Sequence, residues 1–222
     1  MSKIKVAFQG EKGAYSHIAS QTIYKNAEVK NCATFEETFK TAYEDEDIKA
    51  IIPLENSLAG RVADIHYLLT KYKLQIYGEH FQNVEHCLLC KKEVELKDIK
   101  YVRSHAQAIG QCQNIIKKNK FKSIISADTA GSAKDLADSK DNSIAAIASE
   151  LAAKIYNLKI LEKNIEDENG NVTRFLIMGK NVKQPEFEKN KKYITTCIFR
   201  LKSEPSALYK SLGGFATNQI NL

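Results

Sequence analysis

The sequence predicts an α/β protein with two lobes and mainly parallel strands. Short apolar runs alternate with stretches of helical period along most of the 222 residues, and this alternation is typical of layered α/β domains. The stretch from Leu74 to Cys90 is long, extended and without a helical period, so we expect it to cross between the lobes. A second crossing is expected near Asn157 to Leu161, where the chain returns to the first lobe.

The predicted elements follow from apolar periodicity and from the turn residues that bound it. Strands are expected at 4–8, 29–33, 48–53, 100–102, 122–126, 143–148, 158–162 and 174–179. Helices are expected at 15–25, 35–44, 58–71, 105–118, 129–138 and 149–156. Ligands in open α/β sheets bind beyond the carboxyl ends of the strands, so the loops there are the first candidates for a site.

The first predicted strand leads through two glycines into a helix. Ile4, Val6 and Phe8 alternate along the strand, and Gly10 and Gly13 follow before the helix begins. Two glycines at this spacing fall short of a dinucleotide-binding fingerprint. The turn by itself therefore predicts no nucleotide.

Polar side chains follow the third predicted strand. Pro53 ends the apolar run, Glu55, Asn56 and Ser57 come next, and the helix at 58–71 follows. One interpretation is that Asn56 and Ser57 only cap this helix, because short polar side chains are preferred at that position. The other is that they point into a ligand site.

A second polar cluster lies where the strand at 100–102 passes into the helix at 105–118. Ser104 and Gln107 fit a capping box, in which each side chain bonds the other's backbone N–H. Gln111 falls on the polar stripe beside the buried face of this helix. Ser104 is expected to cap the helix whether or not it also contacts a ligand.

The third cluster precedes the strand at 174–179. An Asn169–Gly170 pair predicts a tight turn, and Thr173 and Arg174 stand at the mouth of the apolar strand. Arginine is suited to bidentate contact with a carboxylate. The alternative is a turn with an exposed arginine.

Composition excludes several classes of function. The net charge of +6 comes from lysines spread along the chain, without a basic segment or stacking aromatic residues, so no nucleic-acid partner is expected. No secretory signal and no membrane-spanning apolar run are recognisable, and we expect a cytoplasmic protein. Cys87 and Cys90 lack a second pair of ligands, so no metal is expected, and His86 is predicted to pack or to lie on a strand surface. The four arginines, Arg61, Arg103, Arg174 and Arg200, lie mostly in or beside the polar clusters, which suits a dianion.

Taken in order, the clusters resemble the prephenate dehydratase family over residues 3 to about 180. The resemblance rests on a G-x-x-G start, a P-x-E-N-S-x-x-G segment, an S-H-x-Q-x-x-x-Q-C segment and an N-x-T-R-F segment. The matching residues are Gly10, Gly13, Ser16, Pro53, Glu55, Asn56, Ser57, Gly60, Ser104, His105, Gln107, Gln111, Cys112, Asn171, Thr173, Arg174 and Phe175.

This resemblance implies two lobes like those of a type-II periplasmic binding protein, with the ligand in the cleft between them. We expect a catalytic domain at 1–180, with lobe one at about 1–76 and 159–180 and lobe two at about 77–158. A linker at 181–192 and an incomplete regulatory module at 193–222 would follow.

The implied activity is the decarboxylative dehydration of prephenate to phenylpyruvate in L-phenylalanine biosynthesis, without a cofactor. The resemblance makes Thr173 the catalytic hydrogen-bond donor to the departing hydroxyl group. It assigns substrate binding to Asn56, Ser57, Ser104, Gln111, Arg174 and Phe175. The alternative function is a two-lobed sensor of small molecules or amino acids without catalysis.

The end of the sequence resembles the start of an ACT domain, a ferredoxin-like regulatory module. A strand is expected at 193–199, then a helix opened by Glu204–Leu208, then another strand from Asn218. Ala207 and Leu208 match the family's effector segment, with Ser206 in place of its glycine, and the later E-S-R-P segment is missing. We therefore expect weak or no binding of L-phenylalanine, and a homodimer or homotetramer if this module were complete.

Overall fold

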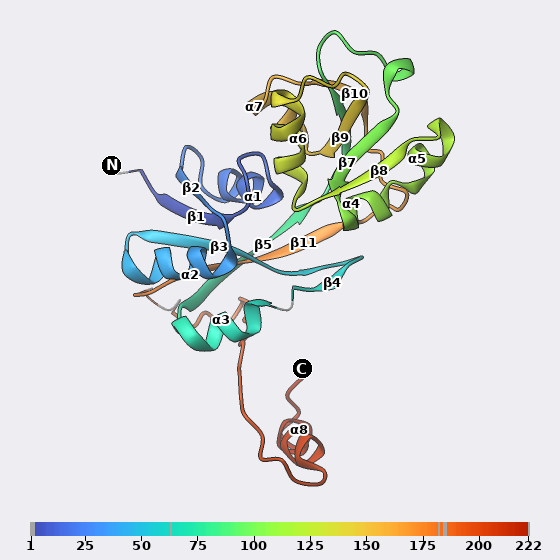
Figure 1. Ribbon diagram of the computed structural model, residues 1–222. Helices are drawn as coiled ribbons and strands as arrows, with labels where there is room; N and C mark the ends of the chain where they lie inside the picture. Colours follow the sequence, from blue (N-terminus) through green and yellow to red (C-terminus); the bar gives the residue numbers. More distant parts are fainter. Residues whose placement is uncertain (1–2, 63, 182, 184–185, 222) are drawn as a thin grey trace. The chain divides into compact units, whose positions relative to one another are not determined.

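The computed structural model describes residues 3–62, 64–181, 183 and 186–221 (Figure 1). The chain divides into two compact units, Met1–Pro185 and Glu186–Leu222. The first unit contains two β-sheets with helices on both faces of each, which confirms the predicted two-lobed α/β architecture. None of the helices in the described part of the chain is both long and apolar enough to span a membrane.

The sheet of the first lobe has the strand order β2-β1-β3-β11-β5, with β4 paired to β3. Its alternating apolar residues divide between two helical layers. Val6, Ile51 and Phe175 pack with the first helix, whereas Ala7 and Ile52 pack with the second and third. The strands are β1 (Lys5–Gln9), β2 (Glu28–Cys32), β3 (Ile48–Asn56), β4 (Gly60–Arg61), β5 (Gln75–Asn83) and β11 (Val172–Gly179), and the helices are α1 (Tyr15–Ile23), α2 (Phe35–Glu44) and α3 (Asp64–Tyr72).

The sheet of the second lobe has the order β10-β6-β9-β7-β8 and is covered in the same way. Leu88 and Ile147 pack with α4 and α5, whereas Cys87 and Leu89 pack with α6 and α7. Cys87 and Cys90 therefore face opposite sides of one strand and act as core residues. The elements are β6 (Cys87–Cys90), a 3-10 turn at Leu96–Asp98, β7 (Tyr101–His105), α4 (Ala106–Gln111), α5 (Gln113–Asn119), β8 (Lys122–Ser126), α6 (Thr129–Asp138), β9 (Ile144–Ala148), α7 (Glu150–Ile155) and β10 (Lys159–Lys163).

The sheets are mixed, which corrects the expectation of mainly parallel strands. β1 is parallel to β2 and β3, and β7 is parallel to β8 and β9. β11, however, runs antiparallel to both β3 and β5, and β6 runs antiparallel to both β9 and β10. β6 and β11 are the strands that the chain enters after crossing from one lobe to the other. Figure 1 shows β5 and β11 side by side.

The boundaries between the lobes also differ from the expected ones. The expected division placed 77–83 in lobe two, but β5 is hydrogen-bonded to β11 as far as Asn83. It placed 159–163 in lobe one, but β10 pairs with β6 in the second sheet. The crossing segments are therefore 84–86 and 164–171. Strand membership depends on which neighbour accepts the backbone hydrogen bonds, and local sequence does not reveal that neighbour.

Two predicted helices begin or break differently in the structure. In place of a helix from residue 58, Gly60 adopts a φ of +79° and the short strand β4 folds back on β3 before α3 begins. The helix predicted at 105–118 breaks at Cys112, where φ is −125° and ψ is 35°. The Asp167 carboxylate accepts from the backbone N–H groups of Gln113 and Asn114 and so caps α5. A distant acidic residue therefore supplies the cap that starts the new helix.

The second unit contains one helix, α8 (Ala207–Thr217), among its described residues. Residues 193–199 adopt no regular structure, so the strand expected there is absent, as is a strand at 218–221; Leu222 lies outside the described residues. No residue of α8 is buried. A strand needs a hydrogen-bonding neighbour to form, and none is present for this segment in the described part of the unit.

Candidate functional site

A cavity of about 500 Å³ lies between the two lobes and is lined by residues of both. The first lobe contributes residues that follow β1 and β3 and the start of β11, and the second lobe contributes the ends of β7 and β8 and helix α4. Of the predicted site residues, four line this cavity: Asn56, Gln111, Thr173 and Phe175. The cavity therefore unites the P-x-E-N-S, S-H-x-Q and N-x-T-R-F segments, which are far apart in the sequence.

Thr173 and Asn56 are opposite each other in the pairing of β11 with β3. The Asn56 side-chain Oδ1 accepts from the backbone N–H groups of Leu58 and Ala59, at 3.0 and 2.9 Å. Its Nδ2 consequently faces the other way and donates to Thr173 Oγ1 at 2.9 Å. Because Oγ1 accepts this bond, the hydroxyl proton of Thr173 is left to donate elsewhere. Among the described residues the Thr173 hydroxyl has no other hydrogen-bond partner, and it lines the cavity.

Asn171 and Gln111 connect the two lobes beside the cavity. Asn56 Nδ2 also donates to Asn171 Oδ1, at 2.7 Å, and Asn171 Nδ2 donates to Gln111 Oε1, at 3.0 Å. Asn171 is 4% exposed, so its side-chain bonds offset the cost of removing the amide from water. Gln111 was predicted to be a neutral donor to the substrate. In the structure its side-chain oxygen accepts the hydrogen bond from Asn171.

His86 lies in the crossing segment 84–86 and is 2% exposed. Its Nε2 lies 3.1 Å from Gln111 Oε1, and its Nδ1 lies 2.9 Å from the Tyr15 hydroxyl. Burial lowers the pKa of His86, against opposing effects of the Gln111 hydrogen bond and the Glu166 carboxylate. His86 is buried, which agrees with the first of the two expectations, packing or a strand surface, but both ring nitrogens also have polar partners at the cavity.

The predicted carboxylate anchor, Arg174, is engaged by two acidic neighbours. Its guanidinium lies 3.0 Å from Glu55 and 2.7 Å from Glu79, on the strands that flank β11. The hydrogen bond to Glu55, together with that to Glu79, raises the pKa of Arg174. The side chain does not line the cavity described above. Arg174 therefore acts in the structure as a cross-link of three strands.

Ser57 and Ser104 also have structural partners. Ser57 Oγ donates to the Gly170 carbonyl at 2.8 Å and accepts from the Val172 N–H at 2.9 Å, so it clamps the turn before β11. Ser104 is fully buried and donates to the Ile147 carbonyl at 2.7 Å, joining β7 to β9. Neither lines the cavity. The cap of α4 is His105 and not Ser104, and His105 Nδ1 accepts from the Gln107 N–H.

Sequence reasoning did not assign the cavity residues Tyr15, Arg61 and Asp128 to the site. Arg61 stands just after the P-x-E-N-S-x-x-G segment, and this position beside a motif is the sequence signal that points to it. Asp128 follows β8 and caps α6 through a 2.6 Å bond from the Gly131 N–H. Its position beyond the carboxyl end of a strand was a usable signal.

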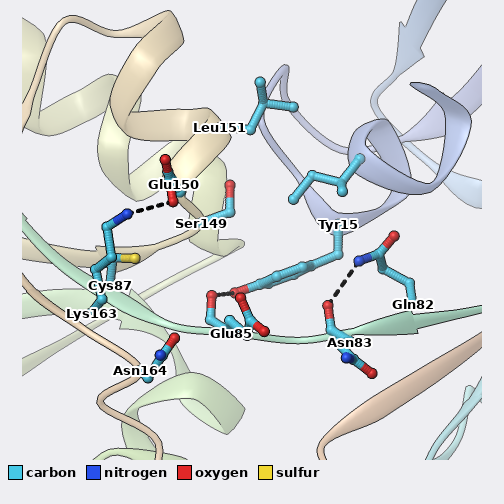
Figure 2. A pocket seen from close by; sticks show the side chains of 11 residues that line it. Tyr15, Gln82, Asn83, Glu85, Cys87, Ser149, Glu150, Leu151, Lys163 and Asn164 are labelled. Carbon is cyan, nitrogen blue, oxygen red and sulfur yellow. Dashed lines mark hydrogen bonds and ion pairs between the residues drawn. The ribbon is translucent and has the colours of Figure 1, made fainter. Parts of the chain in front are cut away.

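A second, smaller cavity of about 330 Å³ shares Tyr15 with the first. Figure 2 shows Tyr15 across its centre, with the Tyr15 hydroxyl bonded to the Glu85 backbone carbonyl at 2.7 Å. On the other wall, Lys163 forms an ion pair with Glu150 at 2.8 Å. Tyr15 therefore separates two hollows, and its hydroxyl is fixed at the start of the crossing to lobe two.

The effector residues predicted in the second unit, Ala207 and Leu208, form the first turn of α8. Leu208 is 58% exposed. Ser206 precedes them with a φ of 64°, in the left-handed region that the glycine of the family pattern would adopt more readily.

The fold and the cavity define a two-lobed α/β protein with a polar ligand site between its lobes. Comparison with known proteins then specifies the family: a family model for prephenate dehydratase matches residues 6–183. The chain belongs to the prephenate dehydratase family.

Similar curated proteins carry two related names. The chain is 40% identical over 221 residues to arogenate dehydratase/prephenate dehydratase 2 of Arabidopsis thaliana, covering 100% of this chain and 58% of that protein. It is 39% identical to the bifunctional N-acyl-homoserine lactone acylase/prephenate dehydratase of Komagataeibacter europaeus, covering 98% of this chain and 77% of that protein. The chain spans little more than half the length of most of the curated relatives described, for example 56% of arogenate dehydratase 2 of Petunia hybrida.

Solved structures agree with the fold. A quorum-quenching acylase structure is 36% identical, with a TM-score of 0.83 over 98% of this chain and 78% of that chain. The prephenate dehydratase of Arthrobacter aurescens in complex with L-Phe superposes with a TM-score of 0.86 over 99% of this chain and 73% of that chain, at 24% identity. The second of these supports the fold alone.

Proposed function

We propose that this chain is a carbon–oxygen lyase of aromatic amino-acid biosynthesis that converts prephenate to phenylpyruvate, water and carbon dioxide. The ring carboxylate leaves as carbon dioxide, and the electron pair of the broken carbon–carbon bond enters the ring. The hydroxyl group para to it leaves with its bonding pair and takes up a proton to become water. Aromatisation drives the reaction, so the enzyme need only bind the dianion and stabilise the departing oxygen.

The observation that carries this proposal is that the hydroxyl hydrogen of Thr173 is available to donate a hydrogen bond into the cavity. Asn56 Nδ2 occupies an acceptor site of the Thr173 hydroxyl at 2.9 Å, so the hydroxyl presents itself to the cavity as a donor. A donor held in advance at a developing negative charge lowers a barrier because it needs no reorganisation during the reaction. Thr173 would donate a hydrogen bond to the leaving oxygen, and the side-chain amides of Gln111 and Asn56 would line the cavity around it.

Arg61 replaces Arg174 as the proposed anchor for a substrate carboxylate. Arg174 is paired with Glu55 and Glu79, whereas Arg61 lines the cavity and forms no ion pair within the described residues. We assign Arg61 to the side-chain carboxylate, which remains in the product. The leaving ring carboxylate would then meet mainly neutral donors, and this arrangement avoids strong stabilisation of the ground state.

Arogenate is the competing substrate, because the names of the plant relatives include arogenate dehydratase. It carries an ammonium group where prephenate carries a ketone. Asp128 is an acidic group at the cavity, but its Oδ1 caps α6 through the Gly131 N–H. We therefore favour prephenate, and the two substrates are distinguished by the assay below.

The acylase activity in the name of the Komagataeibacter relative would need a nucleophile activated by a base. In the second cavity, Ser149 Oγ donates to the Gly13 carbonyl at 2.6 Å and accepts from the Ala152 N–H. Burial raises the pKa of the Cys87 thiol to about 11, which opposes thiolate formation. Neither group in Figure 2 is arranged as a nucleophile, so we propose the dehydratase activity alone.

For the second unit, we propose a linker at 181–192 and an ACT-like segment at 193–222, and that these residues by themselves bind L-phenylalanine weakly or not at all. One exposed helix gives an effector little to bind, and Ser206 holds a strained backbone position beside Ala207. The five cysteines are free thiols, which favours a reducing, cytoplasmic location.

The decisive experiment uses the purified chain with each substrate. Ultraviolet detection of phenylpyruvate from prephenate should show turnover, and phenylalanine formed from arogenate should be slower at equal concentration. Faster turnover of arogenate would reassign the substrate within the same reaction. Saturable binding of prephenate without any product would support the alternative, a two-lobed sensor that needs no donor at Thr173.

A further inference from the structure

We propose that His86 is a positioning residue for Thr173, acting through a continuous chain of hydrogen bonds that joins both lobes. We call this chain the polar relay: Tyr15, His86, Gln111, Asn171 and Asn56. The proposal rests on the dehydratase function proposed above and deepens it, because it names a residue that holds the catalytic donor without contacting the substrate's reacting atoms.

The polarity of the relay is fixed at the Asn56 end. The backbone N–H groups of Leu58 and Ala59 can only donate, so the Asn56 atom they contact is its oxygen. The Asn56 amide nitrogen must then donate both to Thr173 Oγ1 and to Asn171 Oδ1. Two backbone groups therefore decide the direction in which every later amide points.

The same logic passes from Asn171 to His86. Since Asn171 uses its oxygen to accept from Asn56, its nitrogen faces Gln111 and donates to Gln111 Oε1. The Gln111 oxygen is therefore also the atom 3.1 Å from His86 Nε2. Two acceptors would repel each other at that distance, so His86 must carry a proton on Nε2.

The other ring nitrogen faces Tyr15. Tyr15 Oη donates to the Glu85 carbonyl at 2.7 Å and lies 2.9 Å from His86 Nδ1 (Figure 2 shows the Tyr15–Glu85 bond). Burial lowers the pKa of His86, which leaves the ring neutral at neutral pH. The single ring proton is then on Nε2, and Nδ1 shares the Tyr15 proton with the Glu85 carbonyl.

His86 is held in place by both crossings between the lobes. Its backbone N–H donates to Glu166 Oε2 at 2.9 Å, and its carbonyl accepts from the Ile165 N–H at 3.1 Å. Of the neighbouring carboxylates, Glu166 of the second crossing acts on the ring, and Glu85 precedes His86 in the first crossing. Tyr15 comes from α1 of lobe one, and Gln111 from α4 of lobe two. All hydrogen bonds of the polar relay can therefore form only when the two lobes have the relative position seen here. The relay thus couples the relative position of the lobes to the orientation of the Asn56 and Thr173 side chains.

Kinetics of two matched variants test the relay. His86→Leu removes the donor to Gln111 while keeping an apolar volume, and His86→Gln supplies an amide N–H that reaches the Nε2 position. For the full chain we expect kcat to fall about tenfold in His86→Leu, with KM within about twofold, and to recover to within about threefold of the parent in His86→Gln. Equal losses in both variants, or no loss in His86→Leu, would overturn the positioning role.

A measurement that does not depend on activity tests the relay separately from the proposed function. Nitrogen-15 NMR of the ring in the full chain should show the Nε2–H tautomer of His86 at neutral pH, and Asn56→Asp should disturb that signal across the lobes. An Nδ1–H tautomer would overturn the inference even in an active enzyme. An inactive chain with the Nε2–H tautomer would instead refute the dehydratase function and leave the relay intact.

Discussion

Thr173 and Arg174 are consecutive residues of one motif, yet they lie on opposite faces of β11 and have different roles. Thr173 shares its face with Phe175, a lining residue of the cavity, and is held by Asn56. Arg174 shares its face with Leu176 and Met178, the face that α2 and α3 cover, and it bridges Glu55 and Glu79. Successive side chains of a strand point to opposite faces. Consecutive residues of one motif can therefore serve different purposes, one at the cavity and the next in stabilising the sheet.

The same division applies to the other motifs. In P-x-E-N-S, Asn56 lines the cavity, whereas Ser57 clamps the turn before β11. In S-H-x-Q-x-x-x-Q-C, Gln111 lines the cavity and Ser104 is buried between β7 and β9. Motif membership therefore identifies the neighbourhood of a site, and the direction of each side chain decides which members take part in it.

The largest expected effect tests the cavity face of β11. Thr173→Val preserves shape and removes the donor, so kcat should fall roughly 10²- to 10³-fold, while KM and the melting temperature change little. Thr173→Ser restores a hydroxyl group and serves as the matched control, with most of the activity retained. Steady-state assays with prephenate measure both. Near-normal turnover in Thr173→Val would remove Thr173 from its catalytic role.

Arg61 provides the next test, because it takes over the anchoring role once expected of Arg174. A charge-assisted hydrogen bond contributes about 1.5–3 kcal/mol, and Arg61 is exposed, so Arg61→Gln should raise KM by about tenfold and leave kcat within about threefold. The KM of Arg61→Lys should lie between those of the parent and of Arg61→Gln, because an ammonium group keeps the charge but lacks the planar guanidinium geometry. If Arg61→Gln bound prephenate as well as the parent, the carboxylate anchor would lie elsewhere.

Arg174→Met should affect stability rather than chemistry. The substitution leaves Glu55 and Glu79 without their shared cation, and we expect a loss of about 1 kcal/mol, which corresponds to a decrease of about 2–4 °C in melting temperature for a chain of this size. Thermal denaturation measures the loss, and Arg174→Lys, which keeps the charge, should recover part of it. A normal melting temperature combined with a large increase in KM would return Arg174 to the substrate site.

The smallest effect concerns pH. Burial lowers the folded-state pKa of both His17 and His86 below the ordinary value of 6.5. Below that value the unfolded chain binds more protons than the folded chain, so the free energy of unfolding should decrease as the pH falls from about 6.5 toward 5. His86→Gln should weaken this dependence, as measured by urea denaturation at each pH. An unchanged pH slope in the variant would show that His86 titrates normally in the folded protein.

Much of the fold could be predicted because local sequence carries it. Helices such as α2 and α6 match their predicted ranges of 35–44 and 129–138, since each has a side-chain cap, Thr34 or Asp128, next to a periodic apolar face. The limits of α4 and α5 could not be predicted in this way. The cap that separates them is Asp167, more than fifty residues away in the sequence.

The candidate site shows the same limit at the level of single residues. Motif resemblance brought Asn56, Gln111 and Thr173 to one site, and the structure places them around one cavity. It did not identify His86, because a histidine beside an apolar run gives no local sign of its partners. Those partners, Tyr15 and Gln111, come from different lobes.

By itself, the sequence determined the α/β class, the order of most strands and helices, and the family, because periodicity, caps and motif residues are properties of neighbours along the chain. Only the tertiary structure decided which strands pair, where the lobes divide, and that Arg174 is bound by Glu55 and Glu79 while Thr173 keeps a free proton. Hydrogen bonds and ion pairs act over a few ångströms in space, between residues that can lie more than a hundred positions apart in sequence.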